Sequence, residues 1–412
     1  MSRTVYVIGA GLAGLSAAVA LAGRGERVEV FEGAAQAGGR CRSYHDPQLD
    51  AVIDNGNHLV LSGNRAVHAY LERIGASDRL MGPDAAAISF ADLGTGERWT
   101  IRPNAGRAPW WIFARDRRVP KTTPGDYLSL AALLRPPRGK RLDEVVACKG
   151  RLWDKLLHPF LLAVLNTEPE AGSADLAAAV LRETLALGGD ACRPRIAHPT
   201  LAAAFVDPAL AYLEARGATV NLGKRVRGLD LKSGRLAGFA LPDRTVTLEP
   251  EDRAILAVPP WAAQDLIPGL TAPDDFRAIV NGHFLIPAPP GAEPMVGLIG
   301  GTAEWVFAFP DRISVTVSGA DRLLEEDRED LARRLWADVA ALHGLPVELP
   351  PWQIVKERRA TFAATPEQDA RRPPARTAWD NLLLAGDWTA TGLPATIEGA
   401  LRSGRTAADL IP

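Results

Sequence analysis

The chain has 412 residues, of which 47% are apolar and 23% are charged, and its formal net charge is only −2. It can therefore bury large cores, in two or three domains or in two interleaved ones. Its three cysteines, Cys41, Cys148 and Cys192, show no CxxC spacing, which argues against a zinc or disulfide framework and predicts a reduced, cytoplasmic protein. We expect no signal peptide, because the first apolar run belongs to a strand and a turn, and no apolar stretch reaches the ~20 residues of a membrane-spanning helix.

The first predicted elements, over residues 4–32, are a strand, a glycine-rich turn, an alanine-rich helix and a second strand. The turn carries the spacing GxGxxG directly after the strand VYVI. In such a motif the first glycine permits the tight turn, the second lets the backbone approach a pyrophosphate, and the third allows the helix to pack closely on the strand. The pattern predicts a dinucleotide at the helix N-terminus, held by Gly9, Gly11, Leu12, Ala13 and Gly14.

The residues that follow narrow the choice of dinucleotide. Glu32 ends the second strand, where a carboxylate accepts hydrogen bonds from ribose hydroxyls and repels the 2′-phosphate of NADP. Gly38, Gly39 and Arg40 then supply a flexible backbone and a guanidinium that could wrap the far side of a pyrophosphate, whereas NAD-binding domains usually continue into another helix. The alternative for Arg40 and Arg42 is that they are surface charges.

The run VIDNGNHLVL sets several polar residues in apolar surroundings. Gly56 indicates a close approach of the backbone to a ligand, so we expect Gly56, Asn57 and His58 beside the cofactor. His58 could donate a proton, and a structural histidine fits the pattern at least as well.

Residues 98–141 are strongly basic. They hold eleven Lys or Arg against Asp116 and Asp126, so this segment carries +9 and the rest of the chain −11. Basic residues mixed with tryptophan and leucine favour contact with an anionic membrane surface. The alternative is a solvated basic region with core aromatic residues, and nucleic acid is disfavoured because no binding motif accompanies the charge. The aromatic residues of this segment are Trp99, Trp110, Trp111, Phe113 and Tyr127.

The middle of the chain alternates between helical and strand patterns. Residues 142–188 have helical periodicity, and residues 217–258 read as short strands that end in the buried run AILAVPP. Residues 283–318 predict further strands, and residues 321–343 predict an amphipathic helix with an acidic beginning.

The C-terminal stretch NLLLAGDWTATGLPATIEGA is a second strand–turn–helix unit. Gly386 and Asp387 end the strand, and the carboxylate could hold the hydroxyls of a polyol chain. The N–H groups at the start of the next helix would meet the partly anionic edge of a flavin ring. NAD has neither a polyol chain nor such a ring, so the two distant motifs predict FAD. The helix start is expected at Pro394, Ala395 and Thr396.

The chain resembles the superfamily of FAD-dependent amine oxidases and phytoene desaturases. The segments that carry the resemblance are VIGAGLAGLSAAVALAGRG, VEVFEGAAQAGGR, AILAVPP and LLLAGDWTATGLPATIEGALRSGRTAA. Within the superfamily, the segments IDNGNHLVL, LWDKLLHPFLLAVLNTEPEAGSADLAAAVLRETL and GDWTATGLPATIEGA are most similar to the squalene-associated branch, the hydroxysqualene dehydroxylases. The resemblance runs nearly end to end and is loosest over residues 98–141 and 280–350.

This resemblance implies an α/β (α+β) fold, in which a Rossmann-like FAD-binding domain of the glutathione-reductase/amine-oxidase type is interleaved with a substrate domain of helices and a mixed sheet. We assign residues 1–62, 196–260 and 378–412 to the FAD-binding domain. Residues 63–195 and 261–377 then form the substrate domain, helical in the first part and a sheet plus a helix in the second.

The resemblance also implies that the enzyme reduces the allylic alcohol hydroxysqualene to squalene in hopanoid or sterol-like lipid synthesis, without a metal. It places Val226 at the adenine. The reaction needs a proton donor, for which His58, Asp387 and Glu398 are candidates; His58 is favoured because an imidazole pKa can lie near neutrality. Asp387 has the alternative of serving the polyol chain, and Glu398 of facing solvent.

Three matters stay open at this point. The electron source for FAD is unknown. The same superfamily includes desaturases and amine oxidases that act oxidatively, and a flavin-holding lipid carrier is a further alternative. We expect a cytoplasmic protein that contacts the inner membrane face through residues 98–141.

Overall fold

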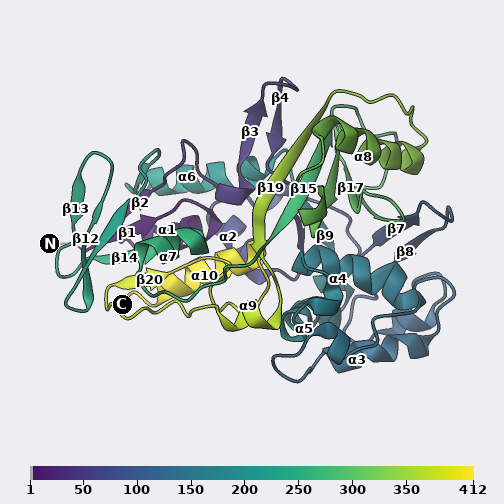
Figure 1. Ribbon diagram of the computed structural model, residues 1–412, viewed down its shortest axis with the longest axis horizontal. Helices are drawn as coiled ribbons and strands as arrows, with labels where there is room; N and C mark the ends of the chain where they lie inside the picture. Colours follow the sequence, from purple (N-terminus) through teal and green to yellow (C-terminus); the bar gives the residue numbers. More distant parts are fainter. Residues whose placement is uncertain (1–2) are drawn as a thin grey trace.

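A computed structural model of the protein describes residues 3–412. Figure 1 shows a parallel sheet at one side of the molecule, close to both chain ends, and a larger mixed sheet in the other half, with helices below it. The parallel sheet has five strands in the order β10-β2-β1-β14-β20. The strands are β1 (Thr4–Ile8), β2 (Arg27–Phe31), β10 (Thr219–Asn221), β14 (Arg253–Leu256) and β20 (Leu382–Leu384).

The parallel sheet is buried on both faces, which explains the continuous apolar runs of its strands. Val5 and Val7 pack into the cluster formed with the helices on one face, whereas Tyr6 and Ile8 pack into the cluster on the opposite face. The helices of the first face are α1 (Leu12–Ala22), α2 (Arg65–Arg73), α6 (Asp207–Glu214) and α10 (Ile397–Asp409). The opposite face is covered by α7 (Pro260–Leu266) and by the antiparallel strands β11 (Gly228–Lys232), β12 (Arg235–Ala240) and β13 (Thr245–Thr247).

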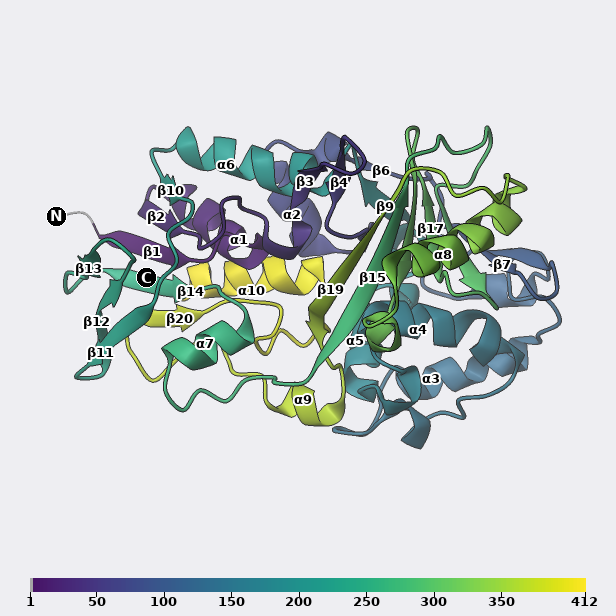
Figure 2. The same cartoon turned by 45° about the horizontal axis from the view of Figure 1, so that its top comes forward.

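Helices α1 and α10 lie side by side and run in the same direction, as Figure 2 shows. The hydroxyl of Ser16 donates to the carbonyl of Leu401 at 2.8 Å, and Arg24 donates to the carbonyl of Ala408 at 3.0 Å. Because the numbering offset between the helices is nearly the same at both contacts, the two helix N-termini lie at the same end of the pair. Two helices from opposite ends of the chain therefore start beside one another.

The second sheet is mixed, and its seven strands have the order β19-β15-β18-β17-β16-β7-β8. Helix α8 (Arg328–His343) covers one face of this sheet through a separate apolar cluster. The strands are β7 (Ile88–Asp92), β8 (Arg98–Ile101), β15 (Phe276–Phe284), β16 (Met295–Ile299), β17 (Trp305–Ala308), β18 (Ile313–Val317) and β19 (Trp352–Phe362). Two short sheets complete the strands, β3 (Ser43–Asp46) with β4 (Ala51–Asp54), and β5 (Leu59–Leu61) with β9 (Pro194–Ala197) and β6 (Leu80–Met81).

Two sequence expectations about these elements are wrong in detail. Residues 63–195 were expected to be helical, yet β7 and β8 lie within them and form an edge of the mixed sheet, where the rings of Phe90 and Trp99 stack across the two strands. Helix α8 (Arg328–His343) starts later than residue 321, because the carboxylate of Asp327 accepts the N–H groups of the first turn and so fixes the helix start.

The helical periodicity of residues 142–188 is confirmed. This part contains α4 (His158–Leu165) and α5 (Ala174–Glu183), which lie with α3 (Ser129–Leu133) beneath the mixed sheet in Figure 1. A short helix, α9 (Pro366–Ala370), follows β19. Within residues 3–412, no helix combines the length and the hydropathy needed to cross a bilayer.

Candidate functional site at the edge of the parallel sheet

The loops that carry the sequence motifs meet at one edge of the parallel sheet. All four strand pairings in this sheet are parallel, so the carboxyl ends of the strands share an edge. Gly9 follows β1, Glu32 follows β2 and Gly386 lies two residues after β20. Gly9 has φ +111°, and a Cβ on it would collide with the carbonyl oxygen of Ala257, so only glycine fits this turn.

The N-terminus of α1 opens onto free space at this edge. Gly11 is the N-cap residue, no side chain caps the helix, and a Cβ built on Gly11 meets nothing within 4 Å. Gly38 lies alongside, because its N–H donates to the carbonyl of Ala10 at 2.8 Å. An uncapped helix N-terminus beside open space fits an anionic phosphate group.

Glu32 is fixed in the turn by two backbone hydrogen bonds. One carboxylate oxygen accepts the N–H of Ala10 and the other accepts the N–H of Ala34, both at 2.8 Å. Each carboxylate oxygen can accept more than one hydrogen bond, so the anchored side chain keeps sites for ligand hydroxyls.

Arg40 and Asp387 bring the N-terminal and C-terminal motifs together. One guanidinium nitrogen of Arg40 donates to both carboxylate oxygens of Asp387 at 2.7 Å, and another donates to the carbonyl of Ala360 at the end of β19. Asp387 is buried, and an ion-paired carboxylate is a hydrogen-bond acceptor only. This geometry argues for a binding role of Asp387 and against its being the proton donor.

The turn after β20 requires a glycine at residue 386. A Cβ on Gly386 would collide with the indole nitrogen of Trp388, which itself donates to the carbonyl of Val258 at 2.9 Å. The hydroxyl of Thr396 caps α10 by accepting the N–H of Gly399 at 3.0 Å. The remaining N–H groups of the first turn of α10 lie at the same end of the helix pair as the N-terminus of α1.

Asn57 presents a buried acceptor atom without a partner. Asn281 of β15 donates from Nδ2 to the carbonyl of Asn55 at 3.4 Å, which orients its Oδ1 to accept the hydroxyl of Thr316 at 2.8 Å. With its own proton committed, Thr316 must accept from Nδ2 of Asn57 at 3.1 Å. The remaining Oδ1 of Asn57 is buried and makes no hydrogen bond within residues 3–412.

An orphaned acceptor of this kind costs free energy unless a ligand donates to it. Gly56 stands next to it, and a Cβ at that position would lie 2.8 Å from Nδ2 of Asn281. The uncapped N-terminus of α1 fits a phosphate group, and the unpaired Oδ1 of Asn57 fits a polar ring atom that donates a hydrogen bond. Both features are expected of a site for a long ligand that carries phosphates and a polar ring.

His58 lies in the same loop and is partly buried, and the pKa of its imidazole differs from the expected one. Burial, with a further contribution from the positive charge of Arg40, lowers the pKa of His58 to about 4. The imidazole is therefore neutral near pH 7, and the expectation of a pKa near neutrality is wrong.

Glu398 is a capping residue of the fold. Its two carboxylate oxygens accept the N–H groups of Ala66 and Val67 at the start of α2, both at 3.0 Å, and Arg402 pairs with it at 3.1 Å. The side chain is buried, so the alternative that it faces solvent is wrong. Because all its partners are donors of the fold itself, we remove it from the candidate acids.

The other predicted cofactor residues lie on the same loops. Leu12 and Ala13 form the first turn of α1, Pro394 and Ala395 precede the cap of α10, and the buried Val226 lies in the loop between β10 and β11. Their contacts with a ligand stay predictions.

Sequence reasoning missed two residues that shape the site. Arg372 is buried and donates to the carbonyl oxygens of Asp387 and Thr389 and to the hydroxyl of Thr391, which fixes the turn after β20. No local pattern in its segment indicates this. Asn281 did carry a signal, since a single asparagine inside the apolar run FRAIVNGHFLI marks a buried polar contact.

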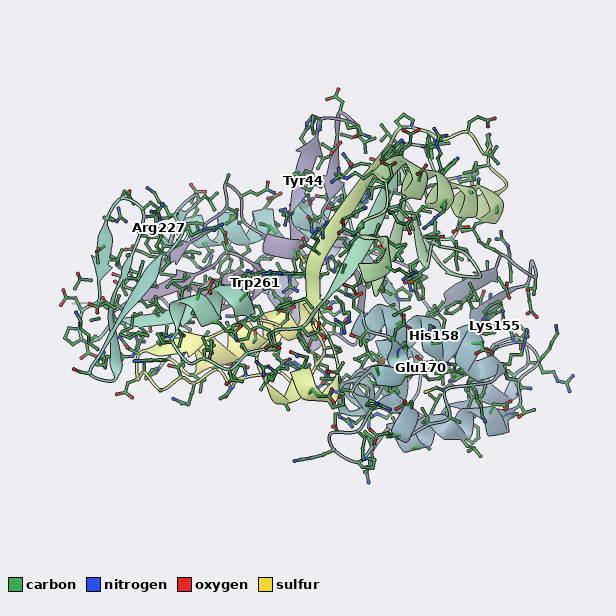
Figure 3. All side chains as sticks on the ribbon, in the orientation of Figure 1. Tyr44, Lys155, His158, Glu170, Arg227 and Trp261 are labelled. Carbon is green, nitrogen blue, oxygen red and sulfur yellow. The ribbon has the colours of Figure 1, made fainter. Side chains whose placement is uncertain are left out.

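One group of side chains bears on the expectation of no metal. His158, Glu168 and Glu170 each place a potential ligand atom within 4.8 Å of the others, and Figure 3 shows His158 and Glu170 together in the helical part. The group joins the first residue of α4 to the segment that follows this helix, and it does not belong to the edge of the parallel sheet.

The comparisons with known proteins define the class. The family described as flavin containing amine oxidoreductase matches residues 12–412, and the chain belongs to this family. A solved structure of an oxidoreductase from Methanosarcina mazei has the same fold, with a TM-score of 0.73 at 17% identity over 99% of this chain and 100% of that one. The protein is thus a flavin-dependent oxidoreductase by family, and its fold is that of the solved structure.

Within that class, curated relatives match the whole chain. A hydroxysqualene dehydroxylase from Rhodopseudomonas palustris is 52% identical over 100% of this chain and 99% of its own length. A hydroxysqualene dehydroxylase from Sinorhizobium fredii is 51% identical over 100% of this chain and 98% of its own. The resemblance to this branch is confirmed over the full length.

Proposed function

We propose that the protein is an enzyme that reduces hydroxysqualene to squalene. The observation that carries this proposal is the 52% identity to a hydroxysqualene dehydroxylase over 100% of this chain and 99% of that relative. In the reaction the allylic C–O bond breaks, a C–H bond forms in its place, and the oxygen leaves as water with one added proton. The substrate gains two electrons.

We propose FAD as the flavin that the site holds. The turn before α1, with Gly9 and Gly11, and the first turn of that helix, with Gly14, would bind the pyrophosphate, and Glu32 would bind the ribose of the adenosine half. Asp387 would hold the ribityl hydroxyls, and the N-terminus of α10 the ring edge. Bound there in its reduced form, FAD would supply the hydride and the proton that the conversion of the allylic alcohol to hydrocarbon and water requires. Heat release of the flavin followed by chromatography distinguishes FAD from FMN.

We propose that the proton for the leaving water does not come from a charged His58, because burial lowers the pKa of that imidazole to about 4. A neutral imidazole still donates one N–H hydrogen bond, so His58 remains a group that could orient the hydroxyl. Asp387 and Glu398 are occupied by partners of the fold. We therefore propose that the neutral imidazole of His58 donates a hydrogen bond to the departing oxygen.

We propose the interleaved division of the chain into residues 1–62, 196–260 and 378–412 around the flavin and residues 63–195 and 261–377 around the substrate. The parallel sheet draws its strands from the first set of ranges, and the mixed sheet from the second. Helix α2 is an exception, because it packs on α10 through the Glu398 cap.

We also propose that the enzyme works in the cytoplasm at the inner membrane face, with residues 98–141 as the contact, because its substrate is a long isoprenoid. The electron donor that reduces the flavin is a separate protein or a nicotinamide cofactor that docks transiently.

The test of the activity is product formation. Purified holoenzyme reduced with dithionite is incubated with hydroxysqualene, and the lipids are extracted and identified by mass spectrometry. Squalene in amounts that exceed the flavin under continued reduction supports the proposal. Conversion of polyenes or amines by the oxidised enzyme, without squalene formation, would favour an oxidative member of the family instead.

A further inference from the structure

Two short helical turns, η3 (Trp110–Phe113) and η4 (Pro124–Leu128), interlock in the basic segment. The rings of Trp111 and Tyr127 meet edge to face with centroids 5.2 Å apart, and the hydroxyl of Tyr127 accepts the N–H of Val119 at 3.0 Å. Both aromatic side chains are buried. The pair fixes the two turns against each other and against the helical part.

The immediate neighbours of this buried pair are exposed. Trp110 is 70% exposed, Phe113 is 62% exposed and Leu128 is 72% exposed. The rings of Trp110 and Phe113 lie 6.2 Å apart between centroids, so they form one apolar patch. Of the five aromatic residues that the sequence offered in this segment, only these two reach solvent, since Trp99, Trp111 and Tyr127 belong to the core.

Unpaired positive charge accompanies the exposed rings. Arg107, Arg115 and Arg117 are exposed, and none of them forms an ion pair with any residue in 3–412. Other cations of the segment are already neutralised, as in the pairs of Lys121 with Glu97 and Lys140 with Glu144. Exposed aromatic and aliphatic side chains on two interlocked turns, in one segment with exposed and unpaired guanidinium groups, have the chemistry that binds an anionic lipid surface.

We propose that Trp110, Phe113 and Leu128 form a membrane anchor that inserts into the interface of an anionic bilayer, with Arg107, Arg115 and Arg117 on the lipid headgroups. Charge complementarity favours an anionic lipid surface as the partner of this face. A second copy of the chain is disfavoured, because two copies of the face would bring like charges together. The anchor rests on the proposed membrane contact of residues 98–141, which it narrows to named side chains, and it does not depend on the proposed reaction, since binding to lipid needs no turnover.

The test uses holoenzyme and sedimentation with vesicles of phosphatidylcholine containing about one third phosphatidylglycerol, compared with pure phosphatidylcholine. We expect binding to the anionic vesicles that weakens as salt is raised. Trp110→Ala with Phe113→Ala should lower the partition coefficient roughly tenfold or more, because the apolar contact is lost. Arg115→Gln with Arg117→Gln should lower it roughly 25-fold, at roughly fivefold for each charge.

Matched controls come from elsewhere on the surface. Val347, which follows α8, is 75% exposed. Arg244 directly precedes β13, and Figure 1 shows β13 at the opposite end of the molecule from α3. Val347→Ser and Arg244→Gln should leave vesicle binding unchanged. Insertion is read from tryptophan quenching by brominated lipid, as the difference between the wild type and Trp110→Phe.

Three results would overturn the anchor. The wild type could fail to bind anionic vesicles at low salt, or the Trp110 and Phe113 variant could bind as the wild type does. The variants could also change the sedimentation of the protein alone without changing its binding to vesicles, which would make the face a contact between copies of the chain.

Discussion

Arg40 donates to both carboxylate oxygens of Asp387 at 2.7 Å, and this one ion pair joins loops that are 347 residues apart in the chain. The same guanidinium also binds the carbonyl of Ala360, which belongs to the long strand β19 of the mixed sheet. The loop after β2, the loop after β20 and the second sheet are thus tied at one point. We infer that the pair fixes the two loops of the candidate flavin site relative to each other and orients the carboxylate toward its ligand.

The first prediction concerns this pair. Asp387→Asn removes the charge and one strong acceptor, and charge-assisted hydrogen bonds of this type contribute about 1.5–3 kcal/mol. We expect the variant to retain flavin roughly 10- to 100-fold more weakly, as measured by the ratio of flavin to protein absorbance during dialysis. Asp409→Asn, in the exposed pair of Arg405 with Asp409, is the control and should retain flavin normally. Full retention by Asp387→Asn would refute the binding role.

A substitution of Glu398 distinguishes a capping role of this side chain from a catalytic one. Glu398→Gln weakens the acceptance of two N–H groups of α2 and the pair with Arg402, so we expect a loss of about 1–2 kcal/mol in the free energy of unfolding. Turnover per bound flavin should be unchanged. Denaturant titration and a rate normalised to flavin content measure the two effects. A variant of normal stability without turnover would reinstate Glu398 as a candidate acid.

The pH dependence of turnover tests the neutral state of His58. With a pKa of about 4, this side chain does not titrate between about pH 6 and pH 8, so its substitution should not reshape the profile of kcat there. We expect His58→Gln to lower kcat and to leave the shape of the profile unchanged. Loss of a titration step near pH 6.5 in the variant would contradict the neutral imidazole, and unchanged kcat would remove His58 from the reaction.

Acid stability tests a second buried histidine. Burial, together with the charge of Arg312, lowers the pKa of His283 to about 4, whereas an unfolded chain has a histidine pKa near 6.5. The unfolded state therefore binds more protons between these values, so the free energy of unfolding is highest above about pH 6.5 and falls as the pH drops toward about 4.

One histidine of this kind can change the free energy of unfolding by roughly 1.4 kcal/mol per pH unit at most. We expect His283→Gln to show a shallower fall in the free energy of unfolding between about pH 6.5 and pH 5, measured by urea titration. His58 contributes a slope of the same sign, so the fall should not vanish. The exposed His45, changed to Gln, serves as the control. An unaltered slope in His283→Gln would contradict the account.

Local patterns predicted the parts of the site that backbone geometry determines. The GxGxxG turn, the strand before Glu32 and the strand before Gly386 are read from apolar runs and glycine positions, because such features follow from conformational rules over a few residues. The parallel sheet then brings them to one edge without further information. The edge at which these loops meet was therefore predictable from the parallel sheet that the resemblance implies.

Features that depend on tertiary contacts were not predictable in the same way. The burial of Glu398 beneath α2, the low pKa of His58 beside Arg40 and the brace formed by Arg372 each require a neighbour that is remote in the sequence. The late start of α8 is different, since the capping residue Asp327 was visible and was outweighed by the acidic helical pattern before it.

The most direct test of the central claim is an anaerobic titration. The purified holoenzyme is photoreduced, hydroxysqualene is added, and the oxidised flavin absorbance is followed while the extracted lipid is analysed for squalene. We expect the oxidised band to return with one squalene formed for each flavin reoxidised, because one hydride and one proton replace the hydroxyl group that leaves as water. A flavin that stays reduced in the presence of hydroxysqualene, in a preparation that retains its cofactor, would contradict it.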